Sequence, residues 1–443
     1  MSAPIPSARR LSKARSVVSS KRHDVINDRS PLVVRLFLYV ICVDWTGLIS
    51  PIEQLLFGGA GSSSVDVDLT SSVWLSTLLN SVIVVSGFSL FIITLFTIKI
   101  KYIKYHGLLL LCVMVLASAL WSVAPDITFK RSLTFVGSML LIIYFVEMLG
   151  SDRVIRCMTQ QFLIIAVFSA ITRVVWRDYS LAPGTHALAS IYGNKNTFGA
   201  MMAVSILGAL YLYTRDKVGQ RYYLWIAVFF LLCDILSTSG TTIVVGLIFF
   251  YIYSQYLLAS RGGAGRILAI LGCLPLLGVV VMAVMDPDTL FGVLGKDATL
   301  TGRTDLWPYV QDYIQERPWF GWGYRSFWQQ QNPLAVDLWK KLGWIIPEAH
   351  NGRLDILLDV GYVGCAAFAY VFLASGITGV QNLKAGNSAI GIVAIMSFVG
   401  FLFYGVSEQI LLNPDARAIM FYLIAISGIY EYRRNRASLR FYR

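Results

Sequence analysis

Four polar residues stand together where a long apolar segment begins. The stretch "EAHNGRLDILLDVG" at residues 348–361 contains His350, Asn351, Arg353 and Asp355. A helix N-terminus and a nearby arginine disfavour imidazolium, so His350 is a candidate general base for a hydroxyl group. Asn351 would orient the imidazole or a ligand, and Arg353 is a candidate binding residue. The alternatives are a capping His-Asn pair, and an Asp355 that is either a second base or the ion-pair partner of Arg353.

A second polar cluster, "IYGNKNTFG" at residues 191–199, has the composition of an anion-binding turn. It places Asn194, Lys195 and Asn196 where an apolar helix is expected to begin. Free N–H groups at a helix N-terminus attract anions, and Lys195 adds a point charge. The same pattern fits an asparagine N-cap beside an incidental lysine equally well.

Further cations occur at the borders of apolar segments. Arg131 ends "WSVAPDITFKR", just before an apolar run that begins at 132, and Arg303 lies in "TLTGRTDLW". The fork of an arginine can donate two hydrogen bonds to phosphate oxygens, so as a set these cations indicate a cradle for a diphosphate. Lys130, Arg173 and Arg177 are explained as well by snorkelling to a membrane interface or by ion pairing.

The elements that must position these residues are membrane helices. Hydrophobic residues make up 56% of the 443 residues and charged residues only 14%, about half the charge usual in a soluble chain. Since a spanning helix needs about 20 apolar residues, the sequence predicts an all-α polytopic membrane protein with about 12 transmembrane helices. The predicted spans are 32–50, 74–98, 106–121, 132–149, 157–176, 196–213, 222–238, 241–258, 267–285, 352–376, 389–407 and 416–431.

The distribution of lysine and arginine predicts the orientation of these spans. The net charge of +12 does not indicate nucleic acid, because the basic residues lie between apolar runs and in the two tails. They alternate so as to place the tails, 1–31 and 432–443, on the cytoplasmic side. Between them the chain divides into helices 1–9 (32–285), one large outer loop (286–351) and helices 10–12 (352–431).

The outer loop at 286–351 is far longer than a connection requires, and loops of this length are usually functional. It holds six of the eleven tryptophans, and short helices, a proline-led break and a glycine turn are expected in it. Trp307 and Tyr324 are candidate residues for stacking on sugars. The alternative is interfacial anchoring and a small hydrophobic core. A disulfide framework and a metal site are not expected, and Asp286 with Asp288 is more typical of a turn than of a metal site.

Four motifs, in order along the chain, resemble the bacterial O-antigen ligase and polysaccharide polymerase family. They are "YGNKNTFG", "TGRTDLW", "RPWFGWGY" and "AHNGRLDILLDVGYVG". The resemblance covers about residues 180–430, and "LWSVAPDITFKRSL" at 120–133 extends it toward exopolysaccharide polymerases of the ExoQ type.

This resemblance implies a GT-C-like glycosyltransferase of the bacterial inner membrane that needs no metal or cofactor. The donor would be an oligosaccharide repeat unit on undecaprenyl diphosphate, joined at the periplasmic face into exopolysaccharide. His350 matches the family's proposed base and Arg303 its diphosphate-binding arginine. Many relatives have a basic residue in the turn that aligns with "STSGT", where this chain has Gly240, so Lys195 and Arg131 are the candidates for a second cation.

Three other functions stay open at this point. The chain could be a ligase that transfers glycan to lipid A core, an oligosaccharide transporter, or a non-catalytic assembly factor. A transporter predicts charges near the bilayer midplane, broken helices and an internal repeat. A chain-length regulator or an export protein is a candidate partner.

Overall fold

The computed structural model describes residues 32–48, 74–97, 100, 102–285, 303–407 and 415–440. Within these ranges the regular structure is helical, apart from one isolated antiparallel bridge between Leu181 and Leu188. A helix lies in each of the twelve ranges predicted to span the membrane. These helices are α2 (Leu32–Trp45), α4 (Trp74–Phe96), α5 (His106–Ala117), α6 (Pro125–Leu149), α7 (Ser151–Val175), α9 (Lys195–Arg215), α10 (Gln220–Ser237), α11 (Gly240–Ala259), α12 (Gly263–Met285), α16 (Gly352–Lys384), α17 (Ser388–Ser407) and α18 (Ala416–Arg440).

The prediction of an all-α polytopic membrane protein is confirmed. Within the described ranges, 9 helical segments are long and apolar enough to cross a membrane. Helix α2 has only 14 residues, fewer than the roughly 20 that a span needs. Since α2, α12 and α18 are not among the nine, the count of twelve spans stays a prediction.

The predicted start of one helix, at residue 132, is wrong. Helix α6 begins at Pro125, because proline suits the first helical position and Asp126 complements the helix dipole in the first turn. Lys130 and Arg131 therefore lie on the helix and not in the connection before it. This places Arg131 about two turns inside α6, where its long side chain can reach neighbouring elements.

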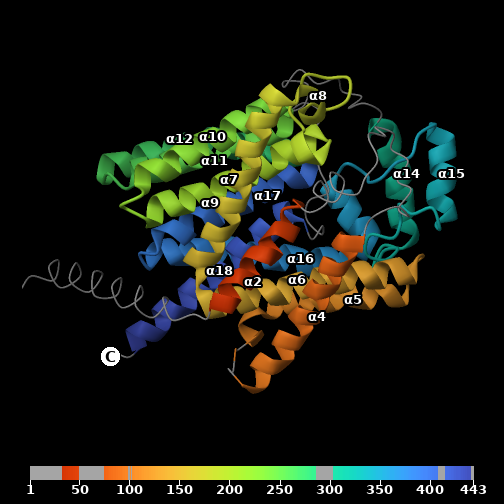
Figure 1. Cartoon of the computed structure of the whole chain (residues 1–443), viewed down its shortest axis with the longest axis horizontal. Coiled ribbons are helices and arrows are strands. Elements are labelled where there is room, and N and C mark those ends of the chain that lie inside the picture. Colours follow the sequence, from red (N-terminus) through yellow and green to blue (C-terminus); the bar gives the residue numbers. More distant parts are fainter. Residues whose placement is uncertain are drawn as a thin grey trace, which may run out of the picture.

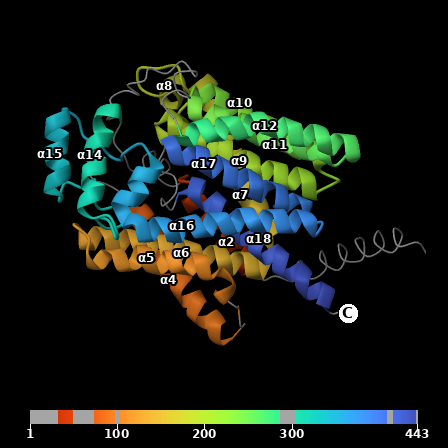
Figure 2. The same ribbon diagram turned by 180° about the vertical axis from the view of Figure 1, so that it is seen from behind.

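The long helices run side by side as a bundle, and the described part of the predicted outer loop lies at one end of it (Figure 1). That part contains α14 (Arg303–Glu316) and α15 (Pro333–Leu342). The view from behind shows the same arrangement, with the C-terminal end of α18 at the opposite end from α14 and α15 (Figure 2). Four short elements complete the helices: η1 (Tyr102–Tyr105), η2 (Ser118–Leu120), α8 (Arg177–Ser180) and η3 (Ser190–Tyr192).

Helices α6 and α9 form the centre of the bundle. Residues 135–146 of α6 and 198–212 of α9 are continuously buried, on every face of the helix. A helix that is apolar all round is expected at the core of a large or membrane protein. The charged residues of both helices lie toward their ends, and the "IYGNKNTFG" cluster lies at the start of α9.

The segment with α14 and α15 has a separate hydrophobic core. Trp322, Phe327 and Trp328 are buried in it, together with Leu306 and Val310 of α14. Leu358 of α16 belongs to the same core, so this segment is attached to the bundle through the first turns of α16. By contrast, Trp319 is 65% exposed and Trp344 is 38% exposed, as side chains at an interface would be.

Candidate functional site

His350 adopts a backbone conformation that side chains rarely take. Its φ is +51°, in the left-handed region, where a non-glycine residue costs about 1–3 kcal/mol. The neighbouring residue Ala349 is held on both sides. Its N–H donates to Oδ1 of Asp355 (2.9 Å), and its carbonyl accepts from the indole of Trp307 (3.1 Å). The side chain of Asn351, the next residue, caps α16. The two hydrogen bonds of Ala349 and this cap together hold His350 in its strained conformation.

The imidazole of His350 lies against an acid and an aromatic ring. Its Nδ1 is 3.1 Å from Oε1 of Glu348, and its side chain is 23% exposed. The Trp344 ring is nearly parallel to it, with the ring centroids 6.4 Å apart and the planes at 20°. The angle of the Glu348 contact is not that of an aligned hydrogen bond, as is common at catalytic sites before substrate binds. Nε2 is thus the ring nitrogen not engaged by Glu348.

Glu348 is held in its charged form. Burial raises the pKa of its carboxyl group. The contact with His350 and the charges of Arg417 and Arg325 lower the pKa by more than burial raises it, so the pKa lies below its ordinary value. At neutral pH Glu348 is therefore a carboxylate that faces one imidazole and two guanidinium groups.

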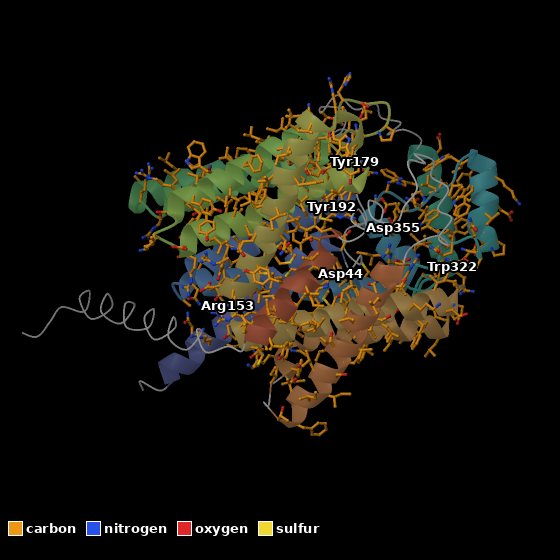
Figure 3. The ribbon with its side chains drawn as sticks, in the orientation of Figure 1. Asp44, Arg153, Tyr179, Tyr192, Trp322 and Asp355 are labelled. Carbon is orange, nitrogen blue, oxygen red and sulfur yellow. The ribbon has the colours of Figure 1, made fainter. Side chains whose placement is uncertain are left out.

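Two more carboxyl groups, Asp355 and Asp359, lie one turn apart on α16, and each residue is only 1% exposed. Oδ1 of Asp355 accepts from the indole of Trp328 (3.1 Å) as well as from Ala349. Its Oδ2, and Oδ2 of Asp359, have no hydrogen-bond partner within the described ranges. Asp355 therefore has other partners than the Arg353 considered for it, and it lies where the bundle meets α14 and α15 (Figure 3).

Helix α16 is broken just below these carboxyl groups. Gly361 has φ +64° and ψ −167°, which no helix contains. The backbone of residues 318–323 lies along the break and pairs with it through four hydrogen bonds. They are Trp322 N to Leu358 O (2.8 Å), Gly323 N to Asp359 O (2.9 Å), Tyr362 N to Pro318 O (2.8 Å) and Val363 N to Trp319 O (3.1 Å). The motifs "RPWFGWGY" and "LDVGYVG" are thus two halves of one structural unit.

Glycines permit this close backbone approach. A Cβ atom on Gly361 would lie 2.4 Å from the carbonyl carbon of Trp319, and one on Gly321 would lie 2.6 Å from the carbonyl oxygen of Leu358. Both glycines also have positive φ, +64° and +67°. Side chains are therefore excluded at both positions by contact and by conformation.

Arg131, a predicted anion-binding residue, connects α6 to the α14–α15 segment. One guanidinium nitrogen donates to the carbonyl of Arg325, and another lies 3.5 Å from Oε1 of Gln329. Arg325 itself has a φ of +51°, so two of the strained non-glycine residues, Arg325 and His350, lie in this region. In this conformation Arg131 holds the backbone of the segment that carries Arg325.

Arg417 is a site residue that the sequence reasoning missed. It precedes the buried part of α18, and its Nε donates to Oδ2 of Asp415 (2.9 Å), whose other oxygen accepts from the N–H of Arg417 and so caps the helix. Its charge acts on Glu348. Its position offered a signal, because an ionisable residue inside a predicted span (416–431) calls for a partner. Arg325 offered no such signal, since it is one of six lysine and arginine residues in the predicted loop 286–351.

The "IYGNKNTFG" cluster lies in the same neighbourhood. Burial raises the pKa of the Tyr192 phenol, the Asp415 carboxylate raises it further, and the charge of Arg417 lowers it. Arg417 is therefore close to both Tyr192 and Glu348. Within the cluster, Oδ1 of Asn194 accepts from the N–H of Asn196 (2.8 Å), so this side chain is an N-cap. Lys195 is the half-buried first residue of α9, and Asn196 is half-buried beside it.

Four other predicted residues are placed less directly. Arg303 is the first residue of α14, but its side chain lies outside the described residues. Trp307 is half-buried against Ala349, and Arg353, the second residue of α16, is half-buried. Tyr324 is fully buried in the bundle core, so its ring does not face solvent in this conformation.

The turn that departs from the family pattern is the predicted tight connection. Helix α10 ends at Ser237 and α11 begins at Gly240. The hydroxyl of Thr242 donates to Oδ1 of the buried Asp234 across this turn (2.6 Å). The six cysteines are free, and the described residues contain no group of three or more His, Cys, Asp or Glu arranged to hold a metal ion.

Comparison with known proteins agrees with the motifs. A family model described as O-antigen ligase matches residues 225–369, which include α14, α15, the strained His350 and the break in α16. The chain is also similar to the exopolysaccharide production protein ExoQ of Rhizobium meliloti (strain 1021), with 24% identity over 295 residues. The matched region covers 62% of this chain and 65% of that relative, slightly less than two thirds of its length. The predicted resemblance to this family is confirmed.

Proposed function

We propose that this chain, a multi-pass membrane protein whose residues 225–369 match the O-antigen ligase family, polymerises lipid-linked glycans. Its substrate is an oligosaccharide repeat unit on undecaprenyl diphosphate, and its product is an exopolysaccharide. The reaction takes place at the periplasmic face of the bacterial inner membrane, with both termini of the enzyme in the cytoplasm. The enzyme uses no nucleotide sugar and no metal.

The strained backbone of His350 is the observation that carries this proposal. A residue held at φ +51° by flanking hydrogen bonds costs free energy, and such strain is typical of functional positions. Here the strain presents an imidazole, backed by a carboxylate, at the junction of the bundle and the α14–α15 segment. That arrangement supports a general base for a sugar hydroxyl.

The chemistry requires three contributions from the protein. The acceptor hydroxyl attacks the anomeric carbon of the donor, the bond to the diphosphate breaks, and the electron pair leaves with the diphosphate oxygen. His350 takes the hydroxyl proton. Cations stabilise the charge on the leaving diphosphate, and the protein holds both sugars in line.

The cations of the site fit the second contribution. Arg303 is the first candidate for the diphosphate, from the family motif. Lys195, at the start of α9, is the second, and Arg417 joins it because its charge acts in the same neighbourhood. Arg131 is a weaker candidate than the motif suggests, because its guanidinium already donates to the carbonyl of Arg325.

Asn194 and Asn196 lie at the start of α9, and Asn351 and Arg353 at the start of α16. We assign these four residues, with Trp307, to substrate binding. The caps formed by Asn194 and Asn351 use only their carbonyl oxygens. Their amide N–H groups are left for sugar hydroxyls or phosphate oxygens, so capping and substrate binding are compatible.

A transporter is the rival function that one observation favours, because α16 is broken near the buried Asp359. In transporters the peptide groups of a broken helix bind the substrate or ion. Here the peptide groups of Leu358, Asp359, Tyr362 and Val363 are already paired with residues 318–323. The break therefore serves to attach the α14–α15 segment, which supports catalysis at the membrane surface over transport.

Reconstitution tests the proposal. The purified protein in liposomes receives an undecaprenyl-diphosphate-linked repeat unit, with a metal chelator and without nucleotide, and products are separated by gel. We expect a glycan ladder from the wild type and a loss of at least about a hundredfold for His350→Ala, as for removal of a general base. His186→Ala, an exposed histidine outside the site, is the matched control and should give the wild-type ladder.

Two results would contradict the proposal in different ways. A normal ladder from the His350→Ala protein would remove His350 as the base. No ladder from folded wild-type protein with intact donor would reject polymerisation. In that case, product on adding lipid A core would indicate the ligase reaction, and movement of the intact donor between leaflets would indicate transport.

A further inference from the structure

A carboxylate lies beside the imidazole that serves as base in the proposed function, although the angle of the contact is not that of an aligned hydrogen bond. Glu348 and His350 are two residues apart, with Oε1 and Nδ1 separated by 3.1 Å. We propose that Glu348 is a positioning residue that fixes the His350 imidazole with its Nε2 lone pair toward the acceptor hydroxyl. This inference rests on the proposed function and adds a second residue to its machinery.

The backbone between Glu348 and His350 is held in a conformation that brings their side chains together. In an extended chain, residues i and i+2 point the same way, but they have no reason to meet at one atom pair. Here the left-handed φ of His350 turns its ring toward Glu348, and Ala349 between them is clamped through both its N–H and its carbonyl. Trp344 lies parallel to the imidazole and restricts rotation of the ring.

The charges around Glu348 favour the same arrangement. His350 faces it from its own segment, Arg325 from the α14–α15 segment and Arg417 from α18. Asp355, on α16, is the other carboxyl group that faces Glu348. The contact with His350, and after it the charges of the two arginines, hold the pKa of Glu348 below its ordinary value. Glu348 can therefore accept a proton-bearing Nδ1 and is not itself the base.

The contact with Glu348 determines which ring nitrogen of His350 carries the proton. An imidazole with Nδ1–H directed at a carboxylate has its lone pair on Nε2, and the partner of one nitrogen sets the role of the other. When Nε2 takes the hydroxyl proton, the new C–O bond forms and the C–O bond to the diphosphate breaks. Glu348 then stabilises the imidazolium until Nε2 releases its proton to water.

A purely structural Glu348 predicts something different. It would lower the amount of folded protein and leave kcat per folded molecule unchanged. A positioning carboxylate instead sets which way the ring is turned, so its removal lowers kcat of the folded protein.

The first test is therefore the steady-state kinetics of polymerisation by Glu348→Gln, measured per folded molecule. We expect kcat to fall by about a hundredfold and KM for the lipid-linked donor to stay near its wild-type value. Glu348→Asp keeps the carboxylate and should recover part of kcat. Glu316→Gln, an exposed acid of the same segment, is the control and should match the wild type.

A second measurement does not depend on activity. The chain has four histidines, so nitrogen-15 NMR of histidine-labelled protein in detergent can isolate the His350 signal by its loss in His350→Gln. We expect the neutral ring to carry its proton on Nδ1 in the wild type, and Glu348→Gln to lose this preference.

The outcomes separate the inference from the proposed function. A wild-type kcat in folded Glu348→Gln, or a wild-type ring protonated on Nε2, overturns the role of Glu348 while leaving His350 as base. If the wild type makes no polymer at all, the proposed function fails first. An Nδ1–H ring in that protein would show that Glu348 orients His350, and its absence would reject that as well.

Discussion

At the end of the bundle away from α14 and α15, charged side chains meet partners of opposite sign near water. Beneath α14 and α15, carboxyl groups are buried, and two of their oxygens have no hydrogen-bond partner in the part of the chain that the structure describes. Figure 3 shows the two ends, with Arg153 at the first and Trp322 and Asp355 at the second. The ion pairs of the first end are Arg215–Asp152 (3.0 Å), Arg156–Asp216 (3.3 Å) and Lys104–Glu147 (3.5 Å).

The second end differs in backbone as well as in charge. Arg325 and His350 have positive φ without being glycines, and Gly361 interrupts a helix. Oδ2 of Asp355 and Oδ2 of Asp359 are buried without hydrogen bonds among the described residues. Strain and unpaired carboxyl oxygens each cost free energy, and here they occur together.

The contrast between the two ends indicates which features of a membrane bundle point to function. Ion pairs at a water-facing end join helices at little cost and are replaceable. Buried charge and strained backbone persist only where something other than stability requires them. Substitutions of the same kind at matched positions test whether the two ends of the bundle differ in this way.

The largest effect is expected where the backbone of the segment lies on the break in α16. Gly321→Ala adds both left-handed strain and a clash with the carbonyl oxygen of Leu358, together about 2–5 kcal/mol. Thermal unfolding in detergent should therefore occur at clearly lower temperature, and limited proteolysis should cut the α14–α15 segment sooner.

Gly343→Ala is the matched control, because Gly343 also has positive φ (+78°) but a Cβ atom there would meet nothing within 4 Å. It should lose only the conformational part, about 1–2 kcal/mol. Equal losses in the two variants would mean that the pairing of residues 318–323 with α16 contributes nothing to stability.

The helices of this chain follow from local information, and the site follows only in part. Apolar runs of about 20 residues located all twelve helices, and Asn194 and Asn351 cap α9 and α16 as their chemistry allows. The start of α6 was predicted too late because proline and aspartate are common in connections between helices. Here Pro125 and Asp126 are instead favourable residues of the first helical turn.

The break in α16 is not visible in the sequence around it. "LDILLDVGYVGCAAFAY" has the pattern of a continuous apolar helix, and the segment that pairs with the break lies about 40 residues earlier. Arg325 and Arg417 were missed for a related reason, since the role of each depends on how its charge acts on Glu348, a residue on another element. Local pattern finds elements, whereas sites depend on contacts between them.

An intermediate effect is expected from the indole that holds Asp355. Trp328→Phe removes a hydrogen bond to a fully buried carboxyl oxygen, and a buried polar group that loses a partner costs about 1–3 kcal/mol. Because Asp355 also holds Ala349, next to His350, we expect polymer yield to fall together with the unfolding temperature. Both are measured on the same purified preparation.

Trp339→Phe is the control for that change. The Trp339 indole donates to the backbone carbonyl of Ile346 (3.0 Å), a neutral acceptor, so its loss should cost only about 0.5–1.5 kcal/mol. Polymer yield should stay near wild type. A Trp339→Phe protein as inactive as Trp328→Phe would show that activity follows the stability of the whole segment and not the environment of Asp355.

The smallest effect is expected at the opposite end of the bundle. Arg215→Gln removes the ion pair with Asp152, but these side chains are 44% and 32% exposed, so solvent screening limits the loss to less than about 1 kcal/mol. The shift in unfolding temperature should shrink further as salt is raised, because the Debye length falls to about 10 Å at 0.1 M ionic strength. Polymer yield in the reconstituted assay should equal that of the wild type. A folded Arg215→Gln protein that makes no polymer would remove the distinction between the two ends, since paired charge near water would then matter to the reaction as much as the strained, buried groups around His350.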